Sequence, residues 1–198
     1  MKTVLLKLRN RHFLAAVLVW MLVTSLTFVS AEDPTGDDGK IREGMAKLAP
    51  LVGSWHAAAL FHNGDKVSER EGTYDVRWAL EETYLEFHVE LHHKDDPSKH
   101  NGFVIYVTYN PVTHQYDSTY FYTRWALRVT ETGEFDPVAQ EFRTKAFIPR
   151  EDGVRDETVH TVTSLRDPNR LVDTHYSRYS DQAAERMNLE ILLTRKKP

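Results

Sequence analysis

The chain has 198 residues, of which 41% are hydrophobic and 11% aromatic, so it can bury the core of one domain and does not have the composition of a disordered protein. It contains no cysteine, which excludes disulfide bonds and a lipid-modified N-terminal cysteine. Its net charge of −4 disfavours contact with the phosphate backbone of nucleic acids.

The first predicted element is a targeting segment. Residues 1–12 carry four basic side chains and no acidic one, residues 13–29 form an apolar run, and Val29-Ser30-Ala31 has the pattern of a cleavage site. We therefore predict that residues 1–31 are a signal peptide cleaved after Ala31. The mature protein would then be periplasmic or extracellular, without stable membrane association. The alternative is an uncleaved membrane anchor, because the apolar run is at the short end of what spans a bilayer.

Cleavage would make the mature chain more acidic. The removed segment holds four of the 25 Lys and Arg residues and none of the 29 Asp and Glu residues. The mature part therefore has 21 basic and 29 acidic residues and a net charge of −8. This surface strengthens the prediction that nucleic acid is not a partner.

Residues 32–40 are acidic, contain Pro and Gly and lack apolar side chains, so we interpret them as a flexible linker. The mature domain, residues 41–198, opens with apolar residues at helical spacing, which predict one short helix ending near Pro50. These apolar residues are Ile41, Met45, Leu48 and Leu51.

From Gly53 onward the hydrophobic pattern has a period of two, which indicates strands. Turn signals separate the strands, including Asn63-Gly64, Asn110-Pro111 and Asp167-Pro168. The pattern predicts an all-β fold: a single antiparallel up-and-down β-barrel of about 8–10 strands, with the short helix before the first strand. Closure into a barrel leaves no unpaired edge strand.

The stretch Tyr84–His93 shows the alternation most clearly. Its apolar parity holds Leu85, Phe87, Val89 and Leu91, and its polar parity holds Glu86, His88, Glu90 and His92. The polar parity could supply part of a metal site, but its position opposite a wholly apolar face predicts that it faces water. We therefore predict no metal site here and no cofactor.

Aromatic side chains are concentrated in the middle strands. Either they fill the interior of the barrel, or they line a space wide enough for one small ligand, and the sequence leaves both possibilities open. The candidate ligand contacts among them are Trp78, Tyr106, Tyr120, Tyr122 and Trp125.

His175 lies in a predicted strand that has no purely apolar parity, as expected for the wall of a ligand-holding barrel. It could be a lone interior polar contact, a haem ligand, or a catalytic base oriented by Asp173, which shares its parity. Tyr176 on the other parity is a further candidate ligand contact. It could also be an ordinary exposed histidine.

The opening of the first predicted strand, Gly53-Ser54-Trp55, resembles that of the lipocalin and calycin group. The resemblance implies that Trp55 closes the floor of the barrel and that a basic residue near the last strand, here Arg195, packs on its ring. Residues 57–59 are alanines where the related nitrobindin type of haem barrel has glycines, and this departure argues against haem.

More narrowly, the chain from Leu48 to Arg195 resembles a bacterial lipocalin-like family, the domain of unknown function 1579 (DUF1579) group. The matching pieces are "LAPLVGSW", the hairpin "YNPVTHQY" and the single closing strand. The family implies a barrel and no particular reaction.

No nucleophile, zinc-protease, phosphate-loop or dinucleotide motif is present in the sequence. We therefore expect an exported barrel that binds a small hydrophobic or aromatic molecule. Two alternatives are an enzyme that uses His175 and Asp173, and a filled barrel with a structural or protein-interaction role. The sequence does not indicate an oligomeric state.

Overall fold

The computed structural model describes residues 35–123, 128–148 and 156–197. The predicted signal peptide, residues 1–31, and the candidate Trp125 lie outside these ranges. In the described part, α2 (Thr35–Ala46) and a 3-10 turn, η1 (Ala49–Leu51), precede ten strands. The strands are β1 (Gly53–Asn63), β2 (Lys66–Ala79), β3 (Tyr84–His93), β4 (His100–Asn110), β5 (Gln115–Tyr122), β6 (Arg128–Asp136), β7 (Glu141–Ile148), β8 (Glu157–Asp167), β9 (Arg170–Tyr179) and β10 (Arg186–Arg195).

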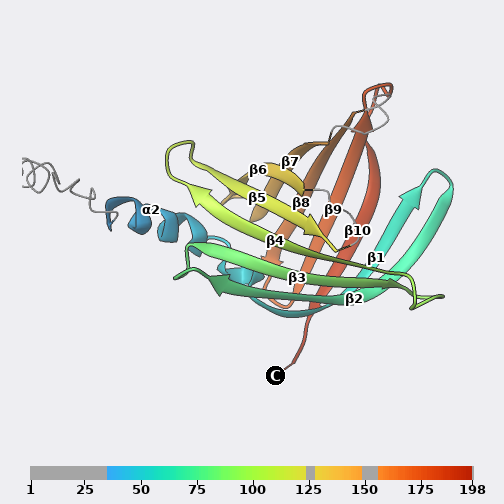
Figure 1. Cartoon of the computed structure of the whole chain (residues 1–198), viewed down its shortest axis with the longest axis horizontal. Coiled ribbons are helices and arrows are strands. Elements are labelled where there is room, and N and C mark those ends of the chain that lie inside the picture. Colours follow the sequence, from blue (N-terminus) through green and yellow to red (C-terminus); the bar gives the residue numbers. More distant parts are fainter. Residues whose placement is uncertain (1–34, 124–127, 149–155, 198) are drawn as a thin grey trace, which may run out of the picture. The chain divides into compact units, whose positions relative to one another are not determined.

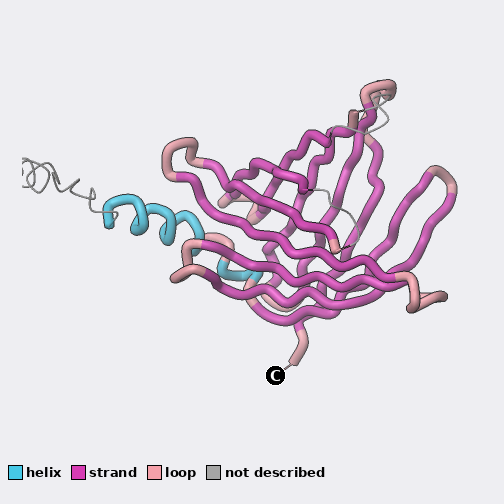
Figure 2. The backbone as a smooth tube through the Cα atoms, in the orientation of Figure 1, coloured by secondary structure: helices cyan, strands magenta, loops and turns pink. Residues whose placement is uncertain are grey.

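The strands form a closed antiparallel barrel, which confirms the predicted fold class. Each strand pairs with its neighbours in sequence, and β1 pairs with β10 to complete the circle, with Trp55 opposite Arg195 and Phe61 opposite Leu189. In Figure 1 the green strands β2 to β4 cross in front of the orange and red strands β8 to β10. The barrel wall consists of strands joined by short loops (Figure 2).

Tight turns with polar side chains set the register of several hairpins. The β4–β5 turn is organised by the side-chain oxygen of Asn110, which accepts hydrogen bonds from the amides of Val112 and Thr113. The β6–β7 turn uses Asp136 in the same way, with donors at the amides of the second and third residues after it. Such local acceptors satisfy amides that a turn would otherwise leave unpaired.

The alternation predicted for Tyr84–His93 is present in β3. Leu85, Val89 and Leu91 are buried in the barrel, whereas His88 and Glu90 are exposed on the outer face. This side-chain direction follows from the pleat of a strand, and it makes the sequence parity a reliable guide wherever one parity is wholly apolar.

The helix begins earlier than predicted. Residues 35–40, assigned to the flexible linker by their composition, are the first half of α2. Asp37 and Asp38, which resembled linker residues, lie in the first helical turn, where acidic side chains favourably oppose the helix dipole. Within the described residues, no helix is both long and apolar enough to cross a membrane.

The end of α2 packs closely on the barrel. Tyr116 donates a hydrogen bond of 2.7 Å from its hydroxyl to the carbonyl of Gly44, and the ring of Tyr109 occupies the space that a side chain at Gly44 would need. Met45 and Leu48 are fully buried beside this contact. A glycine at this position therefore allows the helix backbone to approach the two aromatic rings.

The floor of the barrel has the arrangement that the lipocalin resemblance implies. Trp55 is fully buried and donates from its indole nitrogen to the carbonyl of Leu51 at 2.9 Å. The guanidinium carbon of Arg195 lies 4.0 Å from the centre of the Trp55 ring, a distance at which cation–π attraction is significant. The same guanidinium group donates to the carbonyls of Pro50 and Val52.

Candidate functional site

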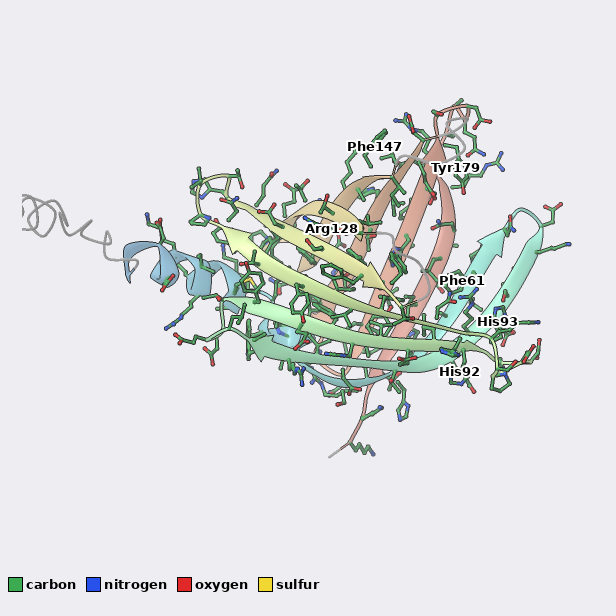
Figure 3. All side chains as sticks on the ribbon, viewed as in Figure 1. Phe61, His92, His93, Arg128, Phe147 and Tyr179 are labelled. Carbon is green, nitrogen blue, oxygen red and sulfur yellow. The ribbon has the colours of Figure 1, made fainter. Side chains whose placement is uncertain are left out.

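The barrel is hollow above its floor. A cavity of about 1120 Å³ extends from Trp55 and Leu51 toward Phe61, near the β1–β2 hairpin. In Figure 3, Phe61 and His93 lie on the side of the barrel where β1 and β2 are joined by their hairpin. The predicted alternative of an interior filled by aromatic side chains is therefore wrong for the described part of the chain.

One wall of the cavity is almost wholly apolar. It is built by β1 to β4 and β10, whose inward parity carries aliphatic and aromatic side chains. The residues of this wall that line the cavity include Trp55, Phe61, Val76, Phe87, Leu91, Phe103, Ile105, Val107, Leu189, Ile191 and Leu193. The polar groups of this wall are the hydroxyl of Tyr74 on β2 and the side-chain amides of Asn101 on β4 and Asn188 on β10.

The facing wall, from β5 to β9, carries most of the polar groups. Among the described lining residues, every carboxyl or imidazole side chain comes from β8 or β9. The polar lining of this wall comprises Ser118, Tyr120, Tyr122, Thr144, Glu157, Thr161, Thr163, Asp173 and His175. The interior is thus apolar on one side and rich in hydrogen-bonding groups on the other.

His175 and Asp173 form an ion pair on β9, because residues two apart on a strand project to the same face. His175 Nε2 lies 2.9 Å from Asp173 Oδ2, and Thr161 Oγ1 lies 3.2 Å from His175 Nδ1. Thr163 donates to Asp173 Oδ1 at 2.7 Å. Both nitrogens of His175 and both oxygens of Asp173 therefore have partners within the wall.

Two opposing effects set the pKa of His175. Burial lowers the pKa, but the charge and hydrogen bond of Asp173 and the charge of Glu131 raise it more, so the pKa lies above its ordinary value. The imidazole therefore favours its charged form more than an exposed histidine does.

Glu131 is the least expected polar group of the interior. It lies on β6 between the inward-facing Val129 and Gly133 and is only 7% exposed. Tyr120 donates from its hydroxyl to Glu131 Oε2 at 3.0 Å. Burial raises the pKa of Glu131 above its ordinary value, although the Tyr120 hydrogen bond opposes this effect.

Three tyrosines bring their hydroxyl groups into the same electrostatic environment. Burial raises the pKa of Tyr74 well above its ordinary value, and the charge of Asp173 across the cavity adds to the increase. Burial and the charges of Glu131 and Asp173 raise the pKa of Tyr120 well above its ordinary value. Burial and the charge of Glu131 also raise the pKa of Tyr122. All three side chains are therefore neutral hydroxyl groups at physiological pH.

Three of the predicted ligand contacts, Tyr120, Tyr122 and His175, line the cavity. Trp78 is partly buried and packs against the core. Tyr106 and Tyr176 lie on the outer face instead, where Tyr106 contacts the exposed Phe121 and the ring of Tyr176 lies beside His160. The prediction that these two tyrosines face the interior is wrong, because β4 carries apolar side chains on both parities and β9 carries polar ones on both, so neither strand showed which parity points inward.

Glu131 and Ser118 were missed by the sequence reasoning. Glu131 is in a strand whose neighbouring parity, Thr130, Thr132 and Glu134, is also polar, so no alternation marked it as buried. Only the register opposite Ser118 on β5 places Glu131 inside, and a single sequence does not reveal that register.

On the Glu86 and His88 face of β3, hydrogen bonds from neighbouring side chains surround the carboxylate. Arg77 donates to Glu86 at 2.7 Å and Tyr106 donates to it at 3.0 Å, while His88 Nε2 lies 2.8 Å from the same carboxylate. The hydrogen bond from Arg77 is the main cause that lowers the pKa of Glu86 to about 2. In the described residues no group of three or more His, Asp or Glu side chains could hold a metal ion.

A second, polar recess of about 600 Å³ lies beside the open end of the cavity. The irregular pairing of β10 with β9 between Met187 and Leu189 accommodates Asn188, which lines both spaces. A β-bulge is a common way to redirect one side chain near a binding site. Asn188 donates a hydrogen bond to the hydroxyl of Ser177 at the junction.

Comparisons with known proteins agree with this architecture. The model of a family described as "Protein of unknown function (DUF1579)" matches residues 42–195. The crystal structure of Rv2717c from M. tuberculosis aligns with a TM-score of 0.56 at 14% identity, covering 78% of this chain and 98% of that one. At this identity the likeness shows the fold alone. No curated protein matches the sequence.

Proposed function

This chain belongs to the DUF1579 family, as its sequence resemblance indicated, and we propose that it is a binding protein that holds a small hydrophobic or aromatic molecule inside its barrel. The observation that carries this proposal is the cavity of about 1120 Å³ with one apolar wall. Preformed cavities with mostly apolar lining and a few fixed polar groups are the usual form of small-molecule sites.

Affinity would come mainly from the removal of apolar ligand surface from water. Burial contributes about 25 cal/mol per Å², before the cost of association is subtracted. The side chains facing β1–β4 and β10 provide this apolar contact, and the hydroxyl groups of Tyr120 and Tyr122 would fix the orientation of the ligand.

The catalytic alternative receives less support from the geometry. A general base must present an accepting nitrogen to the substrate. His175 has Asp173 at one ring nitrogen and Thr161 at the other, so neither nitrogen is directed at the cavity without a competing partner. The ion pair therefore fits a wall-forming role better than proton abstraction.

Titration of the purified mature protein with an environment-sensitive apolar dye tests the proposal. We expect saturable binding of one dye per chain. A Val129→Trp variant should weaken binding, because Val129 lines the cavity and the larger ring would occupy part of it. Thr130→Trp is the matched control, since Thr130 is exposed on the outer face of the same strand.

Unchanged binding in Val129→Trp, with a circular dichroism spectrum equal to that of the original chain, would contradict an interior site. The absence of saturable uptake across a panel of apolar dyes would contradict the binding function as a whole.

We also propose that the chain is exported by residues 1–31, on the basis of the basic, apolar and small-residue order of that segment. The intact mass of the protein recovered from a bacterial host tests this point. A mass that begins at Glu32 is expected, and a full-length mass in the membrane fraction would favour the anchor instead.

A further inference from the structure

The polar wall of the cavity contains an excess of acidic groups. Among the described residues, the carboxyl groups of Glu157 and Asp173 and the imidazole of His175 line the cavity. The carboxyl group of Glu131 is buried beside the lining residues Ser118 and Tyr120 and does not itself line the cavity. Within the described residues, neither Lys nor Arg lines the cavity. Carboxyl groups therefore dominate the electrostatic potential inside the barrel. Charge interactions are stronger there than in water, because the dielectric constant of the interior is low.

Two hydroxyl groups of this wall already donate to carboxyl groups of the protein. Tyr120 donates its proton to Glu131, and Thr163 donates its proton to Asp173. A hydroxyl group that donates still has lone pairs, and a carboxylate can accept further bonds. The hydroxyl groups of Tyr120 and Thr163 and the carboxyl groups that they bind therefore offer a ligand mainly acceptor capacity.

Ser118 is a second observation that points to a bound polar group at this wall. Its hydroxyl lines the cavity and its residue is only 2% exposed, yet it has no hydrogen-bond partner in the described part of the chain. Ser118 lies opposite Glu131 in the β5–β6 register, so the unused hydroxyl is beside the buried carboxyl group. A buried polar group without a partner costs free energy that a bound polar group would recover.

We propose that the molecule held in the barrel carries a protonated amine on an apolar body, that Ser118 and Tyr120 contact the amine, and that Glu131, hydrogen-bonded to Tyr120, balances its charge. This inference rests on the proposed binding function and specifies its ligand class. An ammonium group has three donors and no acceptor, which complements a wall of acceptors, and its charge offsets that of the buried carboxyl group. The apolar body would lie against β1–β4.

An anionic ligand such as a fatty acid is the competing possibility, and Arg70 is the residue that could support it. The guanidinium of Arg70 lies over the ring of Phe61 at 3.9 Å, toward the β1–β2 hairpin. Arg70 is not one of the described residues that line the cavity, whereas Asp173 is. The charge distribution therefore favours a cation in the interior.

Calorimetric titration with three ligands of equal chain length, decylamine, decanol and decanoate, tests the inference on the mature protein at pH 7.5. We expect decylamine to bind about tenfold more tightly than decanol and decanoate to bind most weakly. Glu131→Gln should reduce decylamine affinity at least fivefold and leave decanol affinity unchanged. Glu134→Gln, which removes an exposed carboxylate from the same strand, should change neither affinity.

The outcomes separate the two levels of the proposal. If decanol and decanoate bind as tightly as decylamine, or if Glu131→Gln keeps the preference for the amine, the ligand class is wrong while the cavity function stands. Tightest binding of decanoate, lost on Arg70→Gln, would replace the amine with an anion. If none of the three ligands binds, the cavity function itself fails. A melting curve for each variant establishes that it is folded.

Discussion

The guanidinium of Arg195 occupies the space that a side chain at Gly53 would need. Gly53 also has a φ of +138°, a backbone angle that residues with side chains rarely adopt. These two residues are far apart in the sequence, at the start of β1 and the end of β10, and they meet where the barrel closes. The floor therefore depends on a glycine and an arginine that must be compatible with each other.

Gly53→Ala should destabilise the protein by about 2–4 kcal/mol, because both the backbone angle and the space for Arg195 are lost. Chemical denaturation measures the change. Gly39→Ala in α2 is the control, since a side chain at Gly39 meets nothing within 4 Å and alanine favours a helix. The control should be neutral or slightly stabilising, and equal effects of the two substitutions would contradict this description of the floor.

Arg195→Lys should cost about 1–3 kcal/mol of stability, although it preserves the charge. The guanidinium donates to the carbonyls of Pro50, Val52 and Pro168, and one ammonium group cannot reproduce this geometry. Arg178→Lys, at an exposed position of β9, should leave the denaturation midpoint unchanged. If Arg195→Lys has the same denaturation midpoint as the control variant, Arg195 does not stabilise the floor of the barrel.

The imidazole of His175 should titrate above its ordinary pKa of about 6.5, and Asp173→Asn should lower its pKa. Because the pKa is raised by folding, its contribution to stability is present below the unfolded pKa and is lost as the pH rises through the folded pKa. Nuclear magnetic resonance of the imidazole signals over pH 5–9, about the range of histidine titration, measures both values. A His175 pKa that does not fall in the variant would show that Asp173 is not its main electrostatic partner.

The outer-face carboxylate of Glu86 should give an acid-dependent contribution to stability. Its pKa is lowered to about 2, so the contribution is complete above its unfolded value of 4.5 and is lost as the pH falls toward 2. Arg77 is largely exposed, so we expect Glu86→Gln to cost only about 0.5–1 kcal/mol at pH 7 and to flatten the acid limb of the stability curve. Glu90→Gln on the same face should leave that limb unchanged. If the two variants have the same acid limb, the Arg77 contact does not hold Glu86.

The sequence was sufficient to predict the barrel, because β1 and β3 each have one apolar parity and the turn residues fix where strands end. It was also sufficient for the floor, where Trp55 and Arg195 match a known arrangement. It was not sufficient for the polar wall. In β6 and β9 both parities carry polar side chains, so the inward direction of Glu131 and His175 depends on cross-strand register.

The helix shows a similar limit. Composition separated residues 32–40 from the domain, but acidic residues suit both a linker and the first turn of a helix. The contact that anchors α2, between Gly44 and the rings of Tyr109 and Tyr116, joins segments more than sixty residues apart. A local sequence pattern cannot predict a contact between segments so far apart.

A crystal of the mature protein under xenon pressure provides the most direct test of the hollow barrel. Xenon enters apolar cavities that water leaves empty. We predict an anomalous peak inside the barrel, against the apolar wall near Ile105 and Val76. Continuous side-chain density through the interior, with no xenon between the two walls, would contradict the account.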